Sequence, residues 1–259
     1  MKQKEKHIFF ASDFHLGLNQ PQTSRERESL IVEWLLSIEE NCAELFLLGD
    51  IFDFWFEYGE SIPKGHVRFL GQLAKMSDKG IKIHLFIGNH DMWQKNYLVE
   101  EIGLKLYYEP KVFTFENKKF FLGHGDGLGP GDKKYKIIKS FIRNPFLQFC
   151  YSLIHPTIGL KLMKFFSQKN TTSRYQHTIP DIKKEWLVKF SEETLKSDHI
   201  DYFIFGHRHI AIEHTLSNLK SKYINLGDWL DFCTYAMFDG NELVLKQYDE
   251  SRKNKIFRS

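Results

Sequence analysis

The sequence predicts an α/β sandwich, in which two packed β-sheets are flanked by helices and carry a helical cap insertion. Five short apolar runs, each followed by Asp, Asn or His and usually through Gly, are typical of buried strands that end in loops. Up to Ile87 the predicted order is strand, helix, strand, helix, strand, which favours parallel pairing with covering helices. An apolar content of 42% is enough for a sizeable core in one large domain with an insertion.

The first half of the chain supplies three strands and two helices of this sandwich. Strands are expected at 7–12, 44–48 and 81–87, where bulky residues run together. Ser24 is the expected N-cap of the first helix, because apolar residues follow it at helical spacing through Ile38. A second helix is expected from Gly65 to about Ser77.

The second half is predicted to be richer in strands. Residues 111–122 alternate around Glu116-Asn117-Lys118, a pattern typical of a hairpin. A helix is expected at 181–197, and Asp239-Gly240-Asn241 indicates a second hairpin turn. The remaining expected strands are 202–206, 210–216, 222–226, 233–238 and 242–248. The polar tail after Asp249 is expected to be frayed.

The loop at 51–58 is unusually aromatic, with Phe52, Phe54, Trp55, Phe56 and Tyr58. Two interpretations stay open at this point. The rings either pack in the core, or they form an apolar wall beside a binding site.

The insertion differs from the rest of the chain in charge. From Lys133 to Arg174 there are nine Lys or Arg residues and no Asp or Glu, whereas the remainder holds 27 basic and 33 acidic residues. The segment is also strongly apolar, and Pro145 and Pro156 are expected to divide it into two or three helices. A basic, apolar helical segment suits an anionic amphiphile or an anionic membrane surface. The alternative is a solvated basic face over an ordinary core.

The overall composition excludes several classes of function and location. A net charge of +3 does not indicate nucleic-acid binding, and the three cysteines lack metal-type spacing and suit a reducing cytosol. Residues 1–6 are polar and run into a strand, so we expect no signal peptide. No apolar stretch approaches the length that a membrane span needs. The sequence predicts no particular oligomeric state.

The residues that follow the five apolar runs are the candidate site. They are Asp13-Phe14-His15, Gly49-Asp50, Gly88-Asn89-His90-Asp91, Gly123-His124-Gly125-Asp126 and Gly206-His207-Arg208-His209. A single buried His is more often a satisfied core residue than a ligand. Five such fragments at five strand ends instead indicate one shared site, because loops at strand ends gather binding groups. Asp, His and Asn without Cys suit divalent manganese, iron or zinc.

These five motifs, in this order, resemble the calcineurin-like metallophosphoesterase superfamily over residues 8–228. The resemblance implies a metallophosphoesterase fold and a centre of two divalent metal ions, with manganese expected first and iron, zinc or cobalt as alternatives. It places Asp13, His15, Asp50 and His209 on the first metal. It places Asp50, Asn89, His124 and His207 on the second, so that Asp50 bridges the two.

Further roles follow from the same resemblance. His90 is expected to face the substrate phosphate, stabilising charge or protonating the leaving oxygen, and Asp53 is expected to orient His90. A solvated loop carboxylate is the alternative for Asp53. Asp91 and Asp126 are expected to contact the ligands rather than the metals. Asp228, with Asn225 and Gly227, is expected only to shape its turn.

The insertion narrows the resemblance. After G-H-G-D, the order Gly131-Asp132, Tyr135, Arg143-Asn144-Pro145 and Gln148 is similar to the UDP-2,3-diacylglucosamine pyrophosphohydrolases of lipid A biosynthesis. In that family a basic apolar cap covers the site and holds two acyl chains. The resemblance implies hydrolysis of a UDP-linked diacyl sugar lipid to UMP and 2,3-diacylglucosamine 1-phosphate, by a cytoplasmic protein peripherally bound to the inner membrane. Asp132 and Tyr135 would contact the sugar nucleotide, and Ser167 or Lys169 the phosphates or glucosamine.

The chain departs from that family at His90, where its members mostly have Arg. Arg clamps a phosphate with a fixed double fork, whereas His offers one donor and can move a proton. A phosphodiesterase or phosphatase for another ester is therefore the alternative function. A metal-depleted binding scaffold should have lost ligands, but all seven candidates are present. A DNA nuclease would need a basic track with stacking aromatics, and the aliphatic content of the insertion suits lipid better. The expected division is a core of 1–131 and 179–259 with a cap of 132–178.

Overall fold

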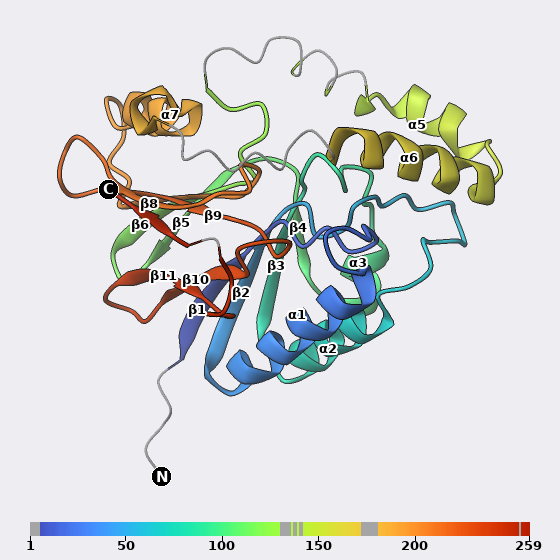
Figure 1. Ribbon diagram of the computed structural model, residues 1–259, viewed down its shortest axis with the longest axis horizontal. Helices are drawn as coiled ribbons and strands as arrows, with labels where there is room; N and C mark the ends of the chain where they lie inside the picture. The colour runs from blue at the N-terminus through green and yellow to red at the C-terminus, as the bar shows by residue number, and fades with distance from the viewer. Residues whose placement is uncertain (1–5, 130–135, 137–138, 140–141, 172–180, 254) are drawn as a thin grey trace.

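The computed structural model describes residues 6–129, 136, 139, 142–171, 181–253 and 255–259, with the backbone alone described for 164–171. Two six-stranded mixed sheets pack face to face, as the sequence predicted (Figure 1). The first sheet has the order β11 (Leu243–Gln247), β10 (Thr234–Phe238), β1 (His7–Ala11), β2 (Cys42–Leu48), β3 (Lys82–Phe86) and β4 (Lys105–Tyr107). The second has the order β12 (Phe257–Arg258), β8 (Ala211–Thr215), β9 (Lys222–Leu226), β7 (Tyr202–Phe205), β6 (Lys118–Leu122) and β5 (Lys111–Phe115).

Parallel pairing joins the strands that carry most of the candidate motifs. Strands β1 to β4 run parallel to one another, and β6, β7 and β9 do so in the second sheet. Strand β10 pairs antiparallel with β11 through the hairpin expected at Asp239-Gly240-Asn241. Strand β5 pairs antiparallel with β6 through the hairpin expected at Glu116-Asn117-Lys118. Because parallel strands end at the same edge of a sheet, the loops after β1, β2, β3, β6 and β7 meet at one end of the sandwich.

The central strands are buried on both faces, which explains their uninterrupted apolar sequences. In β1, Phe9 joins a core between the first sheet and its helices, while Phe10 joins the core between the two sheets. Side chains alternate along a strand, so consecutive apolar residues serve two different cores. The inter-sheet core is largely aromatic, and the rings of Phe10 and Phe120 stack across it with centroids 6.0 Å apart.

Three helices cover the outer face of the first sheet, and one covers the second (Figure 1). They are α1 (Ser24–Ile38), α2 (Val67–Asp78), α3 (Tyr97–Ile102) and α7 (Trp186–Thr194). The short α3 and β4 were not predicted from the sequence. The N-cap of α1 is Thr23 and not Ser24, because Thr23 and Glu26 form a reciprocal capping box. The hydroxyl of Ser24, the first helical residue, instead accepts a hydrogen bond from the Gly17 amide.

Two other predictions about the C-terminal half are wrong. The helix expected at 181–197 is a short 3-10 helix, η2 (Ile182–Lys184), followed by α7, because Glu185 between them is extended. The tail is not frayed throughout, since β12 pairs parallel to β8 and closes an edge of the second sheet. A further 3-10 turn, η1 (Glu39–Asn41), ends α1.

The described part of the insertion is a pair of helices, α5 (Pro145–Ser152) and α6 (Pro156–Thr171), above the sandwich (Figure 1). Both begin at the prolines that were expected to divide the segment, since Pro is favoured in the first turn of a helix. Asn144 caps α5 by accepting a hydrogen bond from the Phe146 amide. Within the described ranges, no helix combines the length and the apolar character needed to cross a bilayer.

Candidate dimetal centre

The seven candidate ligands meet at the common end of the parallel strands. They follow β1 (Asp13, His15), β2 (Asp50), β3 (Asn89), β6 (His124) and β7 (His207, His209). Four of the seven, Asp13, His15, Asp50 and His124, are buried, and the other three are partly buried. The sheet topology thus brings together side chains that lie far apart in the sequence.

The first group of ligand atoms comes from Asp13, His15, Asp50 and His209, and these atoms all lie within 4.8 Å of one another. Nε2 of His209 is 3.5 Å from Oδ1 of Asp13, and Nε2 of His15 is 3.7 Å from Oδ2 of Asp50. These are separations of atoms that surround a common point.

The second group comes from Asp50, His124 and His207 under the same 4.8 Å limit. Nε2 of His124 is 3.3 Å from Oδ2 of Asp50. Asn89 joins them, since its Oδ1 is 2.8 Å from Nδ1 of His207 and 3.2 Å from Nε2 of His124. Asp50 therefore belongs to both groups, the position that a bridging carboxylate occupies in a two-metal site.

Several atoms at this point are buried without the hydrogen bonds that buried polar groups normally make. Within the described part of the chain, Oδ2 of Asp50, both ring nitrogens of His15 and Nε2 of His209 have no hydrogen-bond partner. Such groups cost free energy when they are left unsatisfied. A convergent set of oxygen and nitrogen atoms without hydrogen-bond partners fits a pair of divalent cations.

The electrostatic field of the centre also favours cations. Burial by itself would lower the pKa of His15, yet Asp13 and Asp53 raise it to about 9. Burial likewise opposes the charged form of His124, but Asp50 raises the pKa of this histidine to about 10. The buried carboxylates thus attract positive charge strongly enough to overcome desolvation of the histidines. His207 is the exception, because burial and His124 lower its pKa to about 3.

The glycines of the motifs are needed for close approach of the chain to the ligands. A Cβ on Gly88 would overlap the Asp50 carboxylate and the Asp50 amide. A Cβ on Gly206 would overlap Oδ2 of Asp13 and the Ser12 side chain. Only glycine lets these two strand ends pass directly behind the carboxylates.

His90 and Asp53 lie beside the first group, and the ring of His90 stands edge-on to that of His15 with centroids 4.7 Å apart. Oδ1 of Asp53 is 3.5 Å from Nδ1 of His90 and 3.6 Å from Nδ1 of His15. The backbone oxygen of Asp53 is closer still to Nδ1 of His90, at 3.1 Å. The structure thus places Asp53 between two histidines, where the sequence suggested a contact with one.

Asp91 and Asp126 contact the loops that carry the ligands. Asp91 accepts hydrogen bonds from the amides of Gly88 and Ile51, both at 2.8 Å, and so ties the loop after β3 to the loop after β2. Burial, and secondly Asp50, raises its pKa to about 6. Asp126 forms an ion pair with Lys139 at 2.7 Å, which connects the loop after β6 to the insertion.

Two residues support the ligands in ways that the sequence analysis missed. Asp228 does more than shape its turn, because its Oδ2 is 3.1 Å from Nδ1 of His209, which leaves Nε2 of that ring toward the centre. Gly227-Asp228 follows β9 as Gly49-Asp50 follows β2, so the pattern that revealed Asp50 was present here too. Arg27 is fully buried and donates to the backbone oxygens of Phe14, His15 and Leu18 at 2.6–2.7 Å. An Arg within an amphipathic helix carries no such indication in sequence.

The four residues expected to bind the substrate remain predictions. Asp132 and Tyr135 lie outside the described residues. Ser167 and Lys169 belong to α6, where the backbone alone is described.

Two clefts open beside the centre. One of about 410 Å³ is lined in part by His124 and Asp126. The other, of about 770 Å³, is lined by Asp53 and Phe54 and runs between the start of α6 and the loop at 62–68. Of the aromatic loop, Phe52, Trp55 and Phe56 are core residues, whereas Phe54 forms part of the wall of this larger cleft. Both interpretations of the loop are therefore correct for different rings.

The chain is similar to several known proteins. The family model described as calcineurin-like phosphoesterase matches residues 6–211. A protein named UDP-2,3-diacylglucosamine hydrolase from Porphyromonas gingivalis is 35% identical and covers 94% of this chain and 98% of its own. One of the same name from Haemophilus influenzae is 27% identical, covering 86% and 91%. Among solved structures, Yfce, a phosphoesterase from E. coli, is similar with a TM-score of 0.48 and 15% identity, covering 95% and 96%.

Proposed function

The chain belongs to the calcineurin-like phosphoesterase family, and on this premise we propose that it hydrolyses the pyrophosphate of UDP-2,3-diacylglucosamine to UMP and 2,3-diacylglucosamine 1-phosphate. Family and relatives together identify a metal-dependent hydrolase. The single observation that carries the chemistry is Asp50, whose carboxylate belongs to both groups of converging ligand atoms. The names of the nearly full-length relatives support the substrate.

We propose that Asp13, His15, Asp50 and His209 hold one metal ion and that Asp50, Asn89, His124 and His207 hold the other. Two bound divalent cations would lower the pKa of the attacking water and stabilise the oxygens of the phosphoryl transition state. Oxygen and imidazole donors without thiolates support Mn²⁺, with iron, zinc or cobalt as the competing ions. The chain's own task is to hold these donors rigidly, which the buried carboxylates and their backbone partners support.

His90 is proposed to act on the substrate phosphate. Its backbone amide donates to Oδ1 of Asp50 at 2.8 Å, so its position is tied to the bridging carboxylate. Asp53 lies against Nδ1 of the ring, which supports a fixed ring orientation. The opposite ring nitrogen would then stabilise charge on the phosphate or give a proton to the leaving oxygen.

We further propose that residues 132–178 form a cap over a core of 1–131 and 179–259, and that this cap meets the lipid. Large apolar side chains are exposed on α5 and α6, at Phe146, Phe149, Leu153, Ile158 and Leu162. The segment from 133 to 174 carries nine cations and no anion, which supports contact with an anionic bilayer surface. The proposed location is the cytoplasmic side of the inner membrane, with Asp132, Tyr135, Ser167 and Lys169 contacting the substrate, and no nucleic acid as a partner.

The experiment that tests this function is a manganese-supplemented hydrolysis assay on UDP-2,3-diacylglucosamine, with bis-p-nitrophenyl phosphate as a parallel substrate. We expect UMP release from the lipid substrate to be much faster than cleavage of the small diester. Cleavage of the diester alone would retain the dimetal chemistry and overturn the substrate. It would then favour a sister enzyme for another ester, in which His90 replaces the expected Arg.

A further inference from the structure

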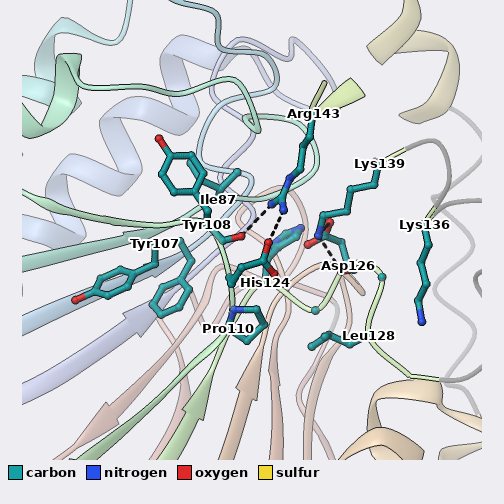
Figure 2. Close-up of a pocket in the computed structure, with 14 residues that line it drawn as sticks. Ile87, Tyr107, Tyr108, Pro110, His124, Asp126, Leu128, Lys136, Lys139 and Arg143 are labelled. Carbon is teal, nitrogen blue, oxygen red and sulfur yellow. Dashed lines mark hydrogen bonds and ion pairs between the residues drawn. The ribbon is translucent and has the colours of Figure 1, made fainter. Parts of the chain in front are cut away.

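The cleft beside His124 has a larger share of polar lining than the other cleft. It is lined by Tyr107, the last residue of β4, and by His124, in the loop after β6 (Figure 2). Its volume of about 410 Å³ is within the range of pockets that hold small-molecule ligands. His124 forms part of its wall, so a ligand in this cleft would reach the second group of candidate metal ligands.

Three cations from the insertion line this cleft, namely Lys136, Lys139 and Arg143. The side chains of Lys139 and Arg143 are only 18% and 25% exposed, so their charges are less screened than those of surface residues. Lys139 is paired with Asp126, next to the centre, and the guanidinium of Arg143 meets Glu109 and the backbone oxygen of Tyr108 further out. Glu109 is 71% exposed, so a ligand can compete for the Arg143 donors at little cost.

Flat apolar groups form the opposite wall. Figure 2 shows the rings of Tyr107, Tyr108 and Pro110 across the cleft from Lys139. The Tyr108 ring is about half exposed, although its hydroxyl is fixed by a hydrogen bond to the backbone oxygen of Gln94 at 3.2 Å. Aromatic faces receive a planar base by stacking, and Arg and Lys donors suit the carbonyl oxygens of a pyrimidine.

The larger cleft on the Asp53 side is more apolar. Leu16, Phe54, Ile62, Val67 and Leu160 contribute much of its lining, and the cations Arg25, Lys64, Arg68 and Lys161 border it. Asp53 contacts His15 and His90 at the first group, whereas His124 belongs to the second. The two clefts therefore approach the centre from different ends, and the one on the Asp53 side has the larger share of apolar lining.

We propose that the cleft lined by His124, Lys139, Arg143 and Tyr108 binds the nucleotide end of the substrate. The lipid end then lies toward the Asp53 side. With its two ends held in different clefts, the substrate can place its pyrophosphate across the centre in only one direction. The inference rests on the proposed function, because only a substrate with a nucleotide at one end and a lipid at the other makes use of both clefts. The base lies against Tyr108, with Arg143 on its carbonyl oxygens and Lys139 toward the phosphate.

The test measures UMP binding to the manganese-loaded protein by titration calorimetry, with inorganic phosphate as the second probe. Arg143→Gln and Tyr108→Ala are each expected to weaken UMP binding about tenfold, as loss of a charge-assisted hydrogen bond or of a stacking contact does. Phosphate binding should change less than twofold in both variants, because phosphate lacks the base. Lys139 is left intact, because it pairs with Asp126 next to the centre. Lys105→Ala, an exposed cation on β4 that does not line the cleft, is the matched control.

The outcomes separate this inference from the function on which it rests. UMP binding that is weakened in Arg143→Gln and Tyr108→Ala but not in Lys105→Ala supports the nucleotide cleft. Unchanged UMP binding in both variants overturns the cleft while leaving the function in place. A wild-type protein that cleaves bis-p-nitrophenyl phosphate, but neither binds UMP nor releases it from the lipid substrate, overturns both.

Discussion

Five of the seven candidate ligands lie on residues with left-handed backbone, namely Asp13, His15, Asp50, His207 and His209. This conformation costs roughly 1–2 kcal/mol for each residue that is not glycine. Such strain persists only where the surrounding structure enforces it, and it gathers at functional sites. The same sharp turns point the side chains inward from the strand ends, so the strained backbone is what brings the ligands together.

Asp50→Asn is expected to abolish metal-dependent hydrolysis, with a loss of at least about 10³-fold. Asn keeps the shape and the acceptor for the His90 amide, but it removes the charge shared by both ligand groups. The fold should be retained because Asn fills the same space, but stability without metal should be lower, since Asp50 is the carboxylate partner of buried His124. Activity assays, metal analysis and thermal unfolding check this. Retained turnover in a metal-stripped variant would contradict the dimetal mechanism.

Arg27→Met is expected to destabilise the protein by about 3 kcal/mol and to weaken metal binding. The change leaves the oxygens of Phe14, His15 and Leu18 buried without their donor, and these oxygens belong to the turn that presents His15. Arg25→Ala, on the exposed side of the same helix, is the control and should stay within about 0.5 kcal/mol. Denaturant unfolding and calorimetric manganese titration measure both effects. Equal metal affinity in Arg27→Met and wild type would show that this turn does not depend on Arg27.

At the scale of residues, the sequence predicted those candidate ligands that lie directly after an apolar run. Asp50 and His124 were found because each follows a strand through one Gly. Arg27 could not be found in this way, since its acceptors are backbone oxygens and helical spacing alone suggests a solvent-facing position. The substrate contacts of Ser167 and Lys169 came from resemblance alone and remain predictions.

At the scale of elements, long strands were predicted well and short or interrupted elements poorly. Consecutive apolar residues identify strands that are buried on both faces, as in β1 and β2. By contrast, β4 and α3 are too short for periodicity to show. The helix predicted across Glu185 is interrupted there because this carboxylate pairs with Arg208 at 2.9 Å, a contact that local sequence does not contain. Glu26, three residues after Thr23, was the available indication of the true start of α1.

Glu44 on β2 links three strands and gives the fold a defined response to acid. It pairs with His84 at 3.0 Å and with Lys82 at 2.9 Å on β3, and His84 lies 3.1 Å from the Tyr107 hydroxyl on β4. The hydrogen bond with His84, although opposed by burial, helps to lower the pKa of Glu44 to about 2. A carboxyl group whose pKa is depressed in the folded state stabilises it above its ordinary pKa and loses that effect as the pH falls.

Glu44→Gln is therefore expected to lower the free energy of unfolding by about 1–2 kcal/mol at pH 7, since the group is partly solvated. The difference from wild type should begin to shrink below about pH 4.5 and vanish toward about pH 2. Urea unfolding of both proteins at pH 7, 5 and 4 measures it. Glu101→Gln, an exposed carboxylate on α3, is the control. A difference that grows on acidification would refute the assignment.

At the scale of the whole molecule, the sandwich carries a helix pair, α5 and α6, with a different surface. Phe146 on α5 and Leu153, which directly follows α5, are 70% and 71% exposed, and each would gain about 1.5–3 kcal/mol by full burial in an apolar medium. The sequence predicted this character from composition, because nine cations without an acid are unusual beside so many apolar residues. It could not predict which side chains stay exposed, since that depends on how α5 and α6 pack.

Replacing Phe146, Phe149 and Leu153 by Ser is expected to reduce binding to anionic phospholipid vesicles at least tenfold. Hydrolysis of bis-p-nitrophenyl phosphate should be retained, since the three side chains lie outside both clefts. Leu219→Ser is the matched control, because Leu219 is 82% exposed but lies in the turn between β8 and β9. Vesicle flotation at two salt concentrations measures binding. Equal flotation of the triple variant and the control would exclude α5 as the membrane contact.

The pairing of β1 with β10 has a consequence for biosynthesis. Residues 7–11 are synthesised long before residues 234–238, which form one of their two neighbours in the sheet. Asp13 and His209 belong to the same group of ligands, so this group cannot form until His209 has been synthesised. The early β1–β2–β3 unit therefore has an open edge throughout translation, the state in which a sheet is most prone to pair with a wrong chain. The first group of ligands is therefore completed only after the segment that carries His209 has been synthesised.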